Sequence, residues 1–163
     1  MVRVRNGKVV DSFDSLIQPP APFDFFNDFN TKLHGIGYPE MEGAPTWPEA
    51  LAAMLEFIGD DILVAHNAQF DMDVLRKTAE HSGIKLPELK YACSLLISRK
   101  VYNLESYRLN AVAYRVGIEE FDHHQALADA DTCAKIIIHA TNHKDVETLE
   151  ELVAATKQTI KSI

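Results

Sequence analysis

The spacing of hydrophobic positions changes several times along the chain, and these changes predict alternating strands and helices. Apolar residues alternate with polar ones on both sides of Asn6-Gly7, which predicts a β-hairpin over residues 2–17 with a two-residue turn. Short apolar runs at 62–65 and 89–94 predict two more strands, the first of them buried. Helical spacing is found at 23–34, 46–59, 71–83, 95–97, 109–117 and 125–140 and beyond 146. A hairpin followed by strand-helix alternation indicates an α/β protein with a mixed sheet.

Several of these helices carry their own start and stop signals. Thr46-Trp-Pro-Glu49 is a capping box with proline in the first turn, and Gly59 is placed to end the helix that follows. Gly35 and Gly117 close two other helices in the same way. We expect no internal repeat and no linker, so residues 1–163 form a single domain.

Asp71 lies where a predicted strand passes into a predicted helix. Enzymes with α/β folds place much of their chemistry at this edge of the sheet. Val74 and Leu75 follow at i+3 and i+4, so Asp71 is expected on a face that turns toward the core. The stretch alone leaves two roles open for Asp71, either a catalytic acid or a simple N-cap of the helix.

Asp129 is a charged residue on a helix that is predicted to be buried on nearly all sides. Its neighbours on one face include Cys133 and Ile136, so the carboxylate should be hydrogen-bonded, protonated or bound to a cation. His124 lies just ahead of this helix and could act as a base beside a ligand. On this segment alone, a pairing of Asp129 with a distant cation is favoured, with His123 and His124 in solvent.

Composition narrows the function further. The chain has 163 residues, 47% of them hydrophobic and 25% charged, as expected of a globular protein large enough to bury a core. The formal charge of −8 argues against nucleic-acid binding through a broad basic surface, but it allows an enzyme that holds phosphates through metal ions. No signal peptide or membrane span is expected, and the lone cysteines Cys93 and Cys133 lack zinc-site spacing. A cytoplasmic location is the expectation.

Two motifs together are more specific than either alone. His66-Asn-Ala-x-Phe-Asp71, with His124-x-x-x-x-Asp129 closing the domain, resembles the second and third exonuclease motifs of the DEDDh superfamily, which includes DNA polymerase III epsilon subunits and RNase T. The resemblance extends to Arg5–Phe13, to Lys32–Ile36 with its His-Gly-Ile element, and to Tyr91–Leu95. It implies a ribonuclease H-like fold and a 3′-5′ exonuclease that releases nucleoside monophosphates from DNA or RNA.

The resemblance also implies roles for individual residues. Asp71 and Asp129 would be catalytic metal ligands for two Mg²⁺ or Mn²⁺ ions, and His124 would be the general base. The implied substrate-binding residues are His34, Gly35, Asn67 and Phe70. Implied partners are single-stranded nucleic-acid 3′ ends and a DNA polymerase or another replication protein.

The sequence departs from the family at its first motif. An Asp-x-Glu on the central first strand should precede Met1, and the chain contains no such strand. Asp145-Val-Glu147 spells the motif but runs into a helix, where Asp145 is expected to be an N-cap. We therefore predict a fold without its central strand and weak or no hydrolysis. Strand edges left unpaired by this loss are expected to be covered or to pair with a second copy.

Three alternatives stay open. The chain could be a catalytically inactive exonuclease-like module that binds nucleic acid or protein. It could hold one metal ion through side chains that the motifs bring near one another, namely His66, His123, His124 and Asp129. It could also be a purely structural α/β domain.

Overall fold

The computed structural model describes residues 1–118 and 125–163. The strands are β1 (Val2–Arg5), β2 (Lys8–Ser12), β3 (Leu63–Ala65), β4 (Lys90–Cys93) and β5 (Lys161–Ser162). The helices are α1 (Asp28–His34), α2 (Tyr38–Met41), α3 (Trp47–Ile58), α4 (Ala68–His81), α5 (Ser94–Val101), α6 (Leu109–Arg115), α7 (Ala126–Lys144) and α8 (Leu149–Ala155). The mixed α/β class predicted from the sequence is confirmed.

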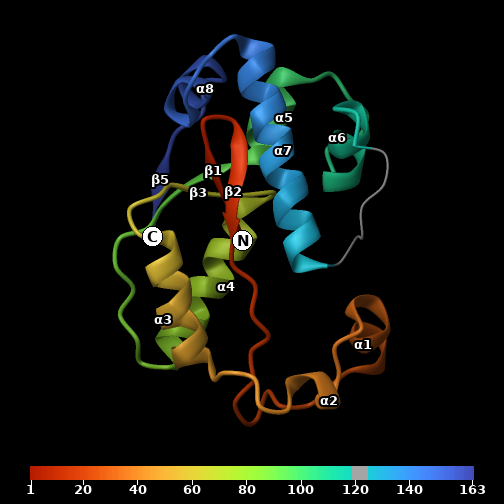
Figure 1. The fold of residues 1–163 in the computed structure, drawn as a ribbon, viewed down its shortest axis with the longest axis vertical. Coiled ribbons are helices and arrows are strands. Elements are labelled where there is room, and N and C mark those ends of the chain that lie inside the picture. Colours follow the sequence, from red (N-terminus) through yellow and green to blue (C-terminus); the bar gives the residue numbers. More distant parts are fainter. Residues whose placement is uncertain (119–124) are drawn as a thin grey trace.

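The strands form two separate sheets. β1 and β2 pair antiparallel, whereas β3 pairs parallel with β4, and β5 joins the other edge of β4 antiparallel. Within the described ranges no ladder connects the two sheets. The long helix α7 packs against β1, β2 and β3 and so spans both sheets, whereas α1 and α2 lie apart from them at one end of the molecule (Figure 1).

The N-terminal hairpin forms as predicted but is shorter. Asn6 and Gly7 have φ angles of 50° and 69°, the positive values that a type I′ turn requires. The register shifts between Arg3 and Val4, which marks a bulge in the pairing. β2 ends at Ser12 rather than near residue 17.

An ionic contact ties this hairpin to the loop before β3. Arg5 Nη2 donates to both carboxylate oxygens of Asp61 at 2.7 Å, and Arg3 Nε donates to the same carboxylate at 3.1 Å. The two guanidinium groups lower the pKa of Asp61, with the hydrogen bond from Arg5 as the largest cause. The Arg3 guanidinium also donates to the backbone carbonyl oxygen of Phe57. It lies 4.4 Å from the centre of the Phe57 aromatic ring.

The predicted helix boundaries hold at several ends, but α1 begins five residues later than expected, and α5 and α7 each end four residues later. The backbone N–H of Thr46 donates to Glu49 at 2.8 Å, which confirms the capping box, and α3 ends at Gly59. Gly35, with φ 73°, closes α1 in the left-handed conformation. Two short elements, α2 and β5, are not predicted by the sequence pattern.

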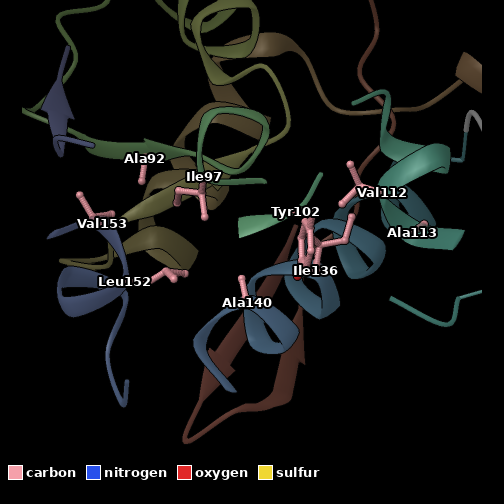
Figure 2. Close-up of a cluster of buried hydrophobic side chains, with 9 residues drawn as sticks. All are labelled: Ala92, Ile97, Tyr102, Val112, Ala113, Ile136, Ala140, Leu152 and Val153. Atoms are coloured by element: carbon pink, nitrogen blue, oxygen red, sulfur yellow. The ribbon is translucent and has the colours of Figure 1, made fainter. Parts of the chain in front are cut away.

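The main core lies where α5, α6, α7 and α8 meet β4. Figure 2 shows side chains from all five elements converging, with Ile136 of α7, Ile97 of α5 and Leu152 of α8 fully buried. A second cluster joins α3 to α4 through Leu51, Ile58, Leu75, Ala79 and Leu89. These cores fix α4, α5 and α7 relative to β3 and β4.

Two expectations about burial are wrong. α7 is fully buried along one face only, at Thr132, Cys133, Ile136 and Ala140. β3 is half-buried rather than buried, because in the described part of the chain it has a strand partner on one edge only. None of the described helices is long and apolar enough to cross a membrane.

Candidate active site

Asp71 lies in the first turn of α4 and does not cap it. The helix begins at Ala68, three residues earlier than expected, and its N-cap is Asn67 in the left-handed conformation with φ 74°. The N-cap role that the sequence left open for Asp71 is therefore wrong. The expected core-facing side is half right, because Leu75 is buried whereas Val74 is 46% exposed.

Asp71 and His66 influence each other electrostatically across the strand-to-helix turn. Burial raises the pKa of Asp71, while the hydrogen bond from its own backbone N–H and the nearby His66 oppose this shift. Burial lowers the pKa of His66, while the carbonyl of Tyr107 and the charge of Asp71 oppose it. Both shifts favour uncharged forms, as expected of groups that are partly withdrawn from water.

Hydrogen bonds fix the tautomer of His66. Nε2 lies 2.7 Å from the carbonyl oxygen of Tyr107, which can only accept, so Nε2 carries the proton. Nδ1 lies 2.8 Å from Ser94 Oγ. Because burial lowers the pKa of His66, the neutral imidazole is favoured, and in this form Nδ1 accepts the hydrogen bond from the Ser94 hydroxyl.

Ser94 extends this network to α7. The thiol of Cys133 donates to Ser94 Oγ at 3.3 Å, and both residues are buried. Burial raises the pKa of Cys133 to about 11, and the charge of Asp71 acts in the same direction. The charge of Asp71 on α4 therefore affects the pKa of a group on α7, on the side of that helix that carries Cys133.

Asp129 lies in the first turn of α7, one turn before Cys133. Its backbone N–H donates to the carbonyl oxygen of Gln125 at 3.0 Å, and its side chain is half-buried. Residues four apart on a helix share a face, so Asp129 and Cys133 lie on the same side of α7. This register places Asp129 on the side of α7 that faces the Ser94–His66–Asp71 region.

His124 and His123 lie outside the described residues. Both ring nitrogens of His66 are hydrogen-bonded, which argues against His66 as a ligand in the single-metal alternative. Across residues 1–118 and 125–163, no three His, Cys, Asp or Glu side chains are grouped as a metal site would require. Asp71 and Asp129 offer carboxylate oxygens, which suit Mg²⁺ or Mn²⁺, but two carboxylates fall short of a two-ion ligand set.

His34 and Gly35 lie at the end of α1. Gly35 N–H donates to the carbonyl oxygen of Thr31 at 2.8 Å, and the N–H of Ile36 donates to His34 Nδ1 at 3.0 Å. His34 lines a cleft of about 340 Å³ between α1 and the segment after β2, together with Phe26 and Met41. This cleft and the Asp71 region are built from different elements.

Asn67 and Phe70 lie beside Asp71, at the start of α4. Phe70 is 66% exposed, and Asn67 lines a second cleft of about 550 Å³ together with His66. Both side chains are thus accessible to a ligand. The substrate-binding role expected of Asn67 and Phe70 stays a prediction.

Asp145 and Glu147 lie in the connection between α7 and α8. Asp145, with φ 54°, ends α7 instead of starting the next helix, and Thr148 is the N-cap of α8. The predicted capping role of Asp145 is therefore wrong. Residues 145–148 connect α7 to α8 and form neither a strand nor a helix.

No functional role is predicted for Ser94 or Cys133 from the sequence. A usable signal exists for Ser94, because it directly follows β4, the parallel neighbour of β3. The carboxyl ends of adjacent parallel strands meet at one sheet edge, so residues 66 and 94 were bound to be close. Cys133 carries no comparable signal.

The sequence is similar to known exonuclease and polymerase sequences. The model of the RNase_T family, described as "Exonuclease", matches residues 1–137. A DNA polymerase III PolC-type protein of Caldanaerobacter subterraneus subsp. tengcongensis is 33% identical over 163 residues, 99% of this chain and 11% of that protein. The DNA polymerase III subunit epsilon of Aquifex aeolicus is 36% identical over 141 residues, 84% of this chain and 67% of that protein. The chain thus spans about a tenth of the PolC-type relative.

Two solved structures share the fold. Exonuclease X in complex with 5′ overhanging duplex DNA has a TM-score of 0.72 at 22% identity, covering 95% of this chain and 87% of that one. A 3′-exonuclease, solved in a study of 3′-end specific recognition of histone mRNA stem-loop, also has a TM-score of 0.72, at 14% identity, covering 99% of this chain and 60% of that one. At these identities the likeness concerns the fold.

Proposed function

Because the chain belongs to the RNase_T exonuclease family, we propose that it binds the 3′ end of a nucleic-acid strand and releases nucleoside monophosphates from it in the 3′-5′ direction. The relation to PolC-type and epsilon proteins supports DNA as a substrate. The observation that carries the proposal is the position of Asp71. Its carboxylate is in the first turn of α4 directly after β3, beside His66 and within electrostatic reach of the α7 face that bears Asp129.

In the proposed site, Asp71 and Asp129 hold divalent cations. A bound Mg²⁺ or Mn²⁺ would supply Lewis-acid stabilisation of the phosphate and a water of lowered pKa. The protein's part is to fix the two carboxylates from separate elements, α4 and α7, that the buried cores hold in place. His124 is proposed as the general base, since an imidazole near neutral pKa can accept a proton from water.

We further propose that residues 1–163 hydrolyse nucleic acid weakly. A four-carboxylate site needs an Asp-x-Glu on a central strand, and the sequence offers that spelling only at Asp145–Glu147, after α7. Among the described residues, the β1–β2 hairpin and the β3–β4–β5 sheet share no ladder. This separation supports the absence, from the described residues, of a central strand that would carry the Asp-x-Glu. An inactive binding module is the rival function.

Calorimetric titration with Mn²⁺ tests the proposed metal site. Binding is expected, with affinity lost in Asp71→Ala and in Asp129→Ala. Asp73→Ala is the matched control, because Asp73 lies on the same helix and pairs with Arg76 at 3.7 Å. Absence of any Mn²⁺ binding by the parent chain contradicts the metal site and favours the binding module.

Digestion of single-stranded DNA labelled within the strand tests the hydrolysis itself. With Mn²⁺, slow release of nucleoside monophosphates is expected, and Asp71→Ala should abolish it while Asp73→Ala retains it. Release that is equal in the parent and Asp71→Ala contradicts the assigned site. Rapid digestion that depends on Asp71 supports the nuclease and overturns the proposed weakness.

The partners proposed for this domain are a replicative polymerase and a second copy of the chain. The PolC-type relative carries the matching segment within a much longer polymerase chain, which supports a polymerase partner. Self-association is proposed because β3 is paired on one edge only in the part of the chain that the structure describes. Light scattering that finds a monomer at all concentrations contradicts self-association.

A further inference from the structure

The cleft beside His66 is lined by positive charges. It has a volume of about 550 Å³ and opens at the carboxyl ends of β3 and β4. Its charged lining residues, among those the structure describes, are Arg99 at the end of α5, Arg108 at the start of α6 and Lys161 of β5. This clustering contrasts with the formal charge of −8 for the whole chain.

The three cations are available to a ligand. All three side chains are exposed, and none forms an ion pair with a carboxylate within residues 1–118 and 125–163. Arg99 lies with its guanidinium 5.9 Å from the centre of the Tyr107 ring. Elsewhere in this part of the chain, Arg3, Arg5 and Arg76 are engaged with carboxylates. The cleft therefore gathers cations that can bind an external anion.

The remaining lining is apolar or carries amide groups. Leu95, Leu96 and Leu109 contribute apolar surface, whereas Asn67 and Gln69 contribute amides that can both donate and accept hydrogen bonds. A ligand that combines a flat apolar ring system with an anionic group would match both kinds of lining. Pockets that bind small ligands typically measure about 300–1,000 Å³, so one nucleotide unit fits the volume.

Backbone pairing explains why Lys161 lies at this cleft. Lys161 is the direct partner of Tyr91 in the antiparallel β4–β5 ladder, and directly opposed residues share a face of the sheet. The Tyr91 hydroxyl donates to Gln69 Oε1 at 3.3 Å, which connects this face to the start of α4. β5 thus places Lys161 on the face of the sheet that contacts the start of α4 through Tyr91 and Gln69.

We propose that this cleft binds a phosphate-bearing nucleotide unit, through Arg99, Arg108 and Lys161. We take this unit to be part of a nucleic-acid strand, several nucleotides long, whose 3′ end is held near Asp71. This step rests on the proposed function. His66 borders both the cleft and the Asp71 region, so one strand can reach both. The otherwise acidic protein repels a polyanion elsewhere, which directs a strand toward this cleft.

Fluorescence anisotropy of a 5′-labelled eight-nucleotide oligothymidylate, measured in EDTA over a series of salt concentrations, tests the proposal. The cleft variants are the double variant Arg99→Gln with Arg108→Gln and the single variant Lys161→Gln. Lys100→Gln and Lys157→Gln are the charge-matched controls, because both side chains are exposed and neither lines the cleft. Thermal melting, monitored by circular dichroism, checks that each variant is folded. If the double variant is not folded, Lys161→Gln alone is enough to test the proposal.

The cleft variants are expected to bind more weakly, and the slope of log K against log salt should become shallower by about 0.7 for each phosphate that is no longer neutralised. The controls should match the parent chain. Equal weakening in cleft and control variants overturns the proposal, since it shows a diffuse effect of charge. Binding without divalent ions is independent of hydrolysis, so this result stands apart from any failure of nuclease activity.

Competition by thymidine monophosphate and by inorganic phosphate identifies the source of the phosphate. Displacement of the oligonucleotide by thymidine monophosphate, lost in Lys161→Gln, supports a site that also takes a free nucleotide. Failure of both competitors, with oligonucleotide binding still sensitive to the cleft variants, supports a site that requires a connected strand. Oligonucleotide binding that no cleft variant affects overturns the site for either source.

Discussion

The thiol of Cys133 lies 3.3 Å from the hydroxyl of Ser94 and links α7 to α5 inside the protein. Ser94 in turn contacts His66 Nδ1, so a single hydroxyl serves both a thiol and an imidazole. This arrangement joins α7, the helix of the proposed ligand Asp129, to the turn that leads into α4, the helix of Asp71. The geometry of the site therefore depends on Ser94, although Ser94 has no proposed catalytic or metal-binding role.

Replacing Ser94 with alanine should destabilise the protein. The variant leaves the buried thiol and His66 Nδ1 without their partner, at a cost of about 1–3 kcal/mol. Ser98→Ala is the matched control, because Ser98 is equally buried on the same helix and its hydroxyl has no hydrogen-bond partner in the described part of the structure. Urea denaturation measures both. Equal losses in the two variants would show that the Ser94 network adds nothing to stability.

Stability should fall at alkaline pH. Burial raises the pKa of Cys133 to about 11 from 9.0 and that of Tyr102 to about 12 from 10.0. Both groups are neutral when protonated, so the unfolded chain loses its protons first and the stabilisation present below pH 9 is lost as the pH rises toward about 12. Denaturation at a series of pH values should show this decline.

Variants assign the two parts of that alkaline decline. Cys133→Ala should flatten its lower part and Tyr102→Phe its upper part. Tyr114→Phe is the control for Tyr102, because Tyr114 is 73% exposed. A decline that neither Cys133→Ala nor Tyr102→Phe alters would mean that other groups are responsible.

Ile136 should be among the most sensitive positions of the core. Its side chain is fully buried on α7 among residues of α5, α6 and α8. Ile136→Ala should cost about 2–5 kcal/mol and Ile136→Val about 0.5–1.5 kcal/mol, because a cavity remains. Val10→Ala, at a position 56% exposed, should change stability by no more than about 0.5 kcal/mol. Chemical denaturation would contradict this ranking if Val10→Ala were the costlier change.

The N-cap of α8 should contribute measurably to stability. The hydroxyl of Thr148 accepts a hydrogen bond from the Glu151 N–H at 3.1 Å, and Glu151 accepts from the Thr148 N–H at 3.2 Å. Thr148→Ala should cost about 0.5–2 kcal/mol. Thr148→Ser keeps the oxygen and should retain most of the stability. Thermal denaturation measures both variants, and equal losses in Thr148→Ala and Thr148→Ser would contradict the capping role of the oxygen.

Much of the fold was predictable because its signals are local. The Asn6-Gly7 turn, the Thr46–Glu49 capping box and the closing glycines act within a few residues, and each was found in the structure. β5 could not be predicted, because it is a strand only through its pairing with β4, about 70 positions earlier in the chain. The start of α4 was misplaced because Asn67 adopts a left-handed conformation that a non-glycine residue rarely takes.

The candidate site was predictable in part for the same reason. Asp71 and Asp129 stand out as carboxylates beside apolar positions, and both lie in first turns of helices. The hydrogen bonds of His66 depend on Ser94 and Tyr107, which are distant from it in sequence. Ser94 is brought near His66 by the parallel pairing of β3 with β4, and Tyr107 carries no pattern of its own. The basic cleft likewise assembles Arg99, Arg108 and Lys161 from three separate elements. Tertiary contacts, not spacing, determine both features.

The division of the strands into two sheets has a consequence for the cooperativity of unfolding. The β1–β2 hairpin is connected to the rest of the described structure through its packing on α7 and its ion pairs with Asp61, without a shared ladder. A unit connected in this way can open on its own at a lower free energy than global unfolding requires. In native-state hydrogen exchange, the amide of Val4 should exchange through such a local opening, well before the amide of Ile136. Equal protection at the two positions would show that the hairpin and the helical core unfold as one unit.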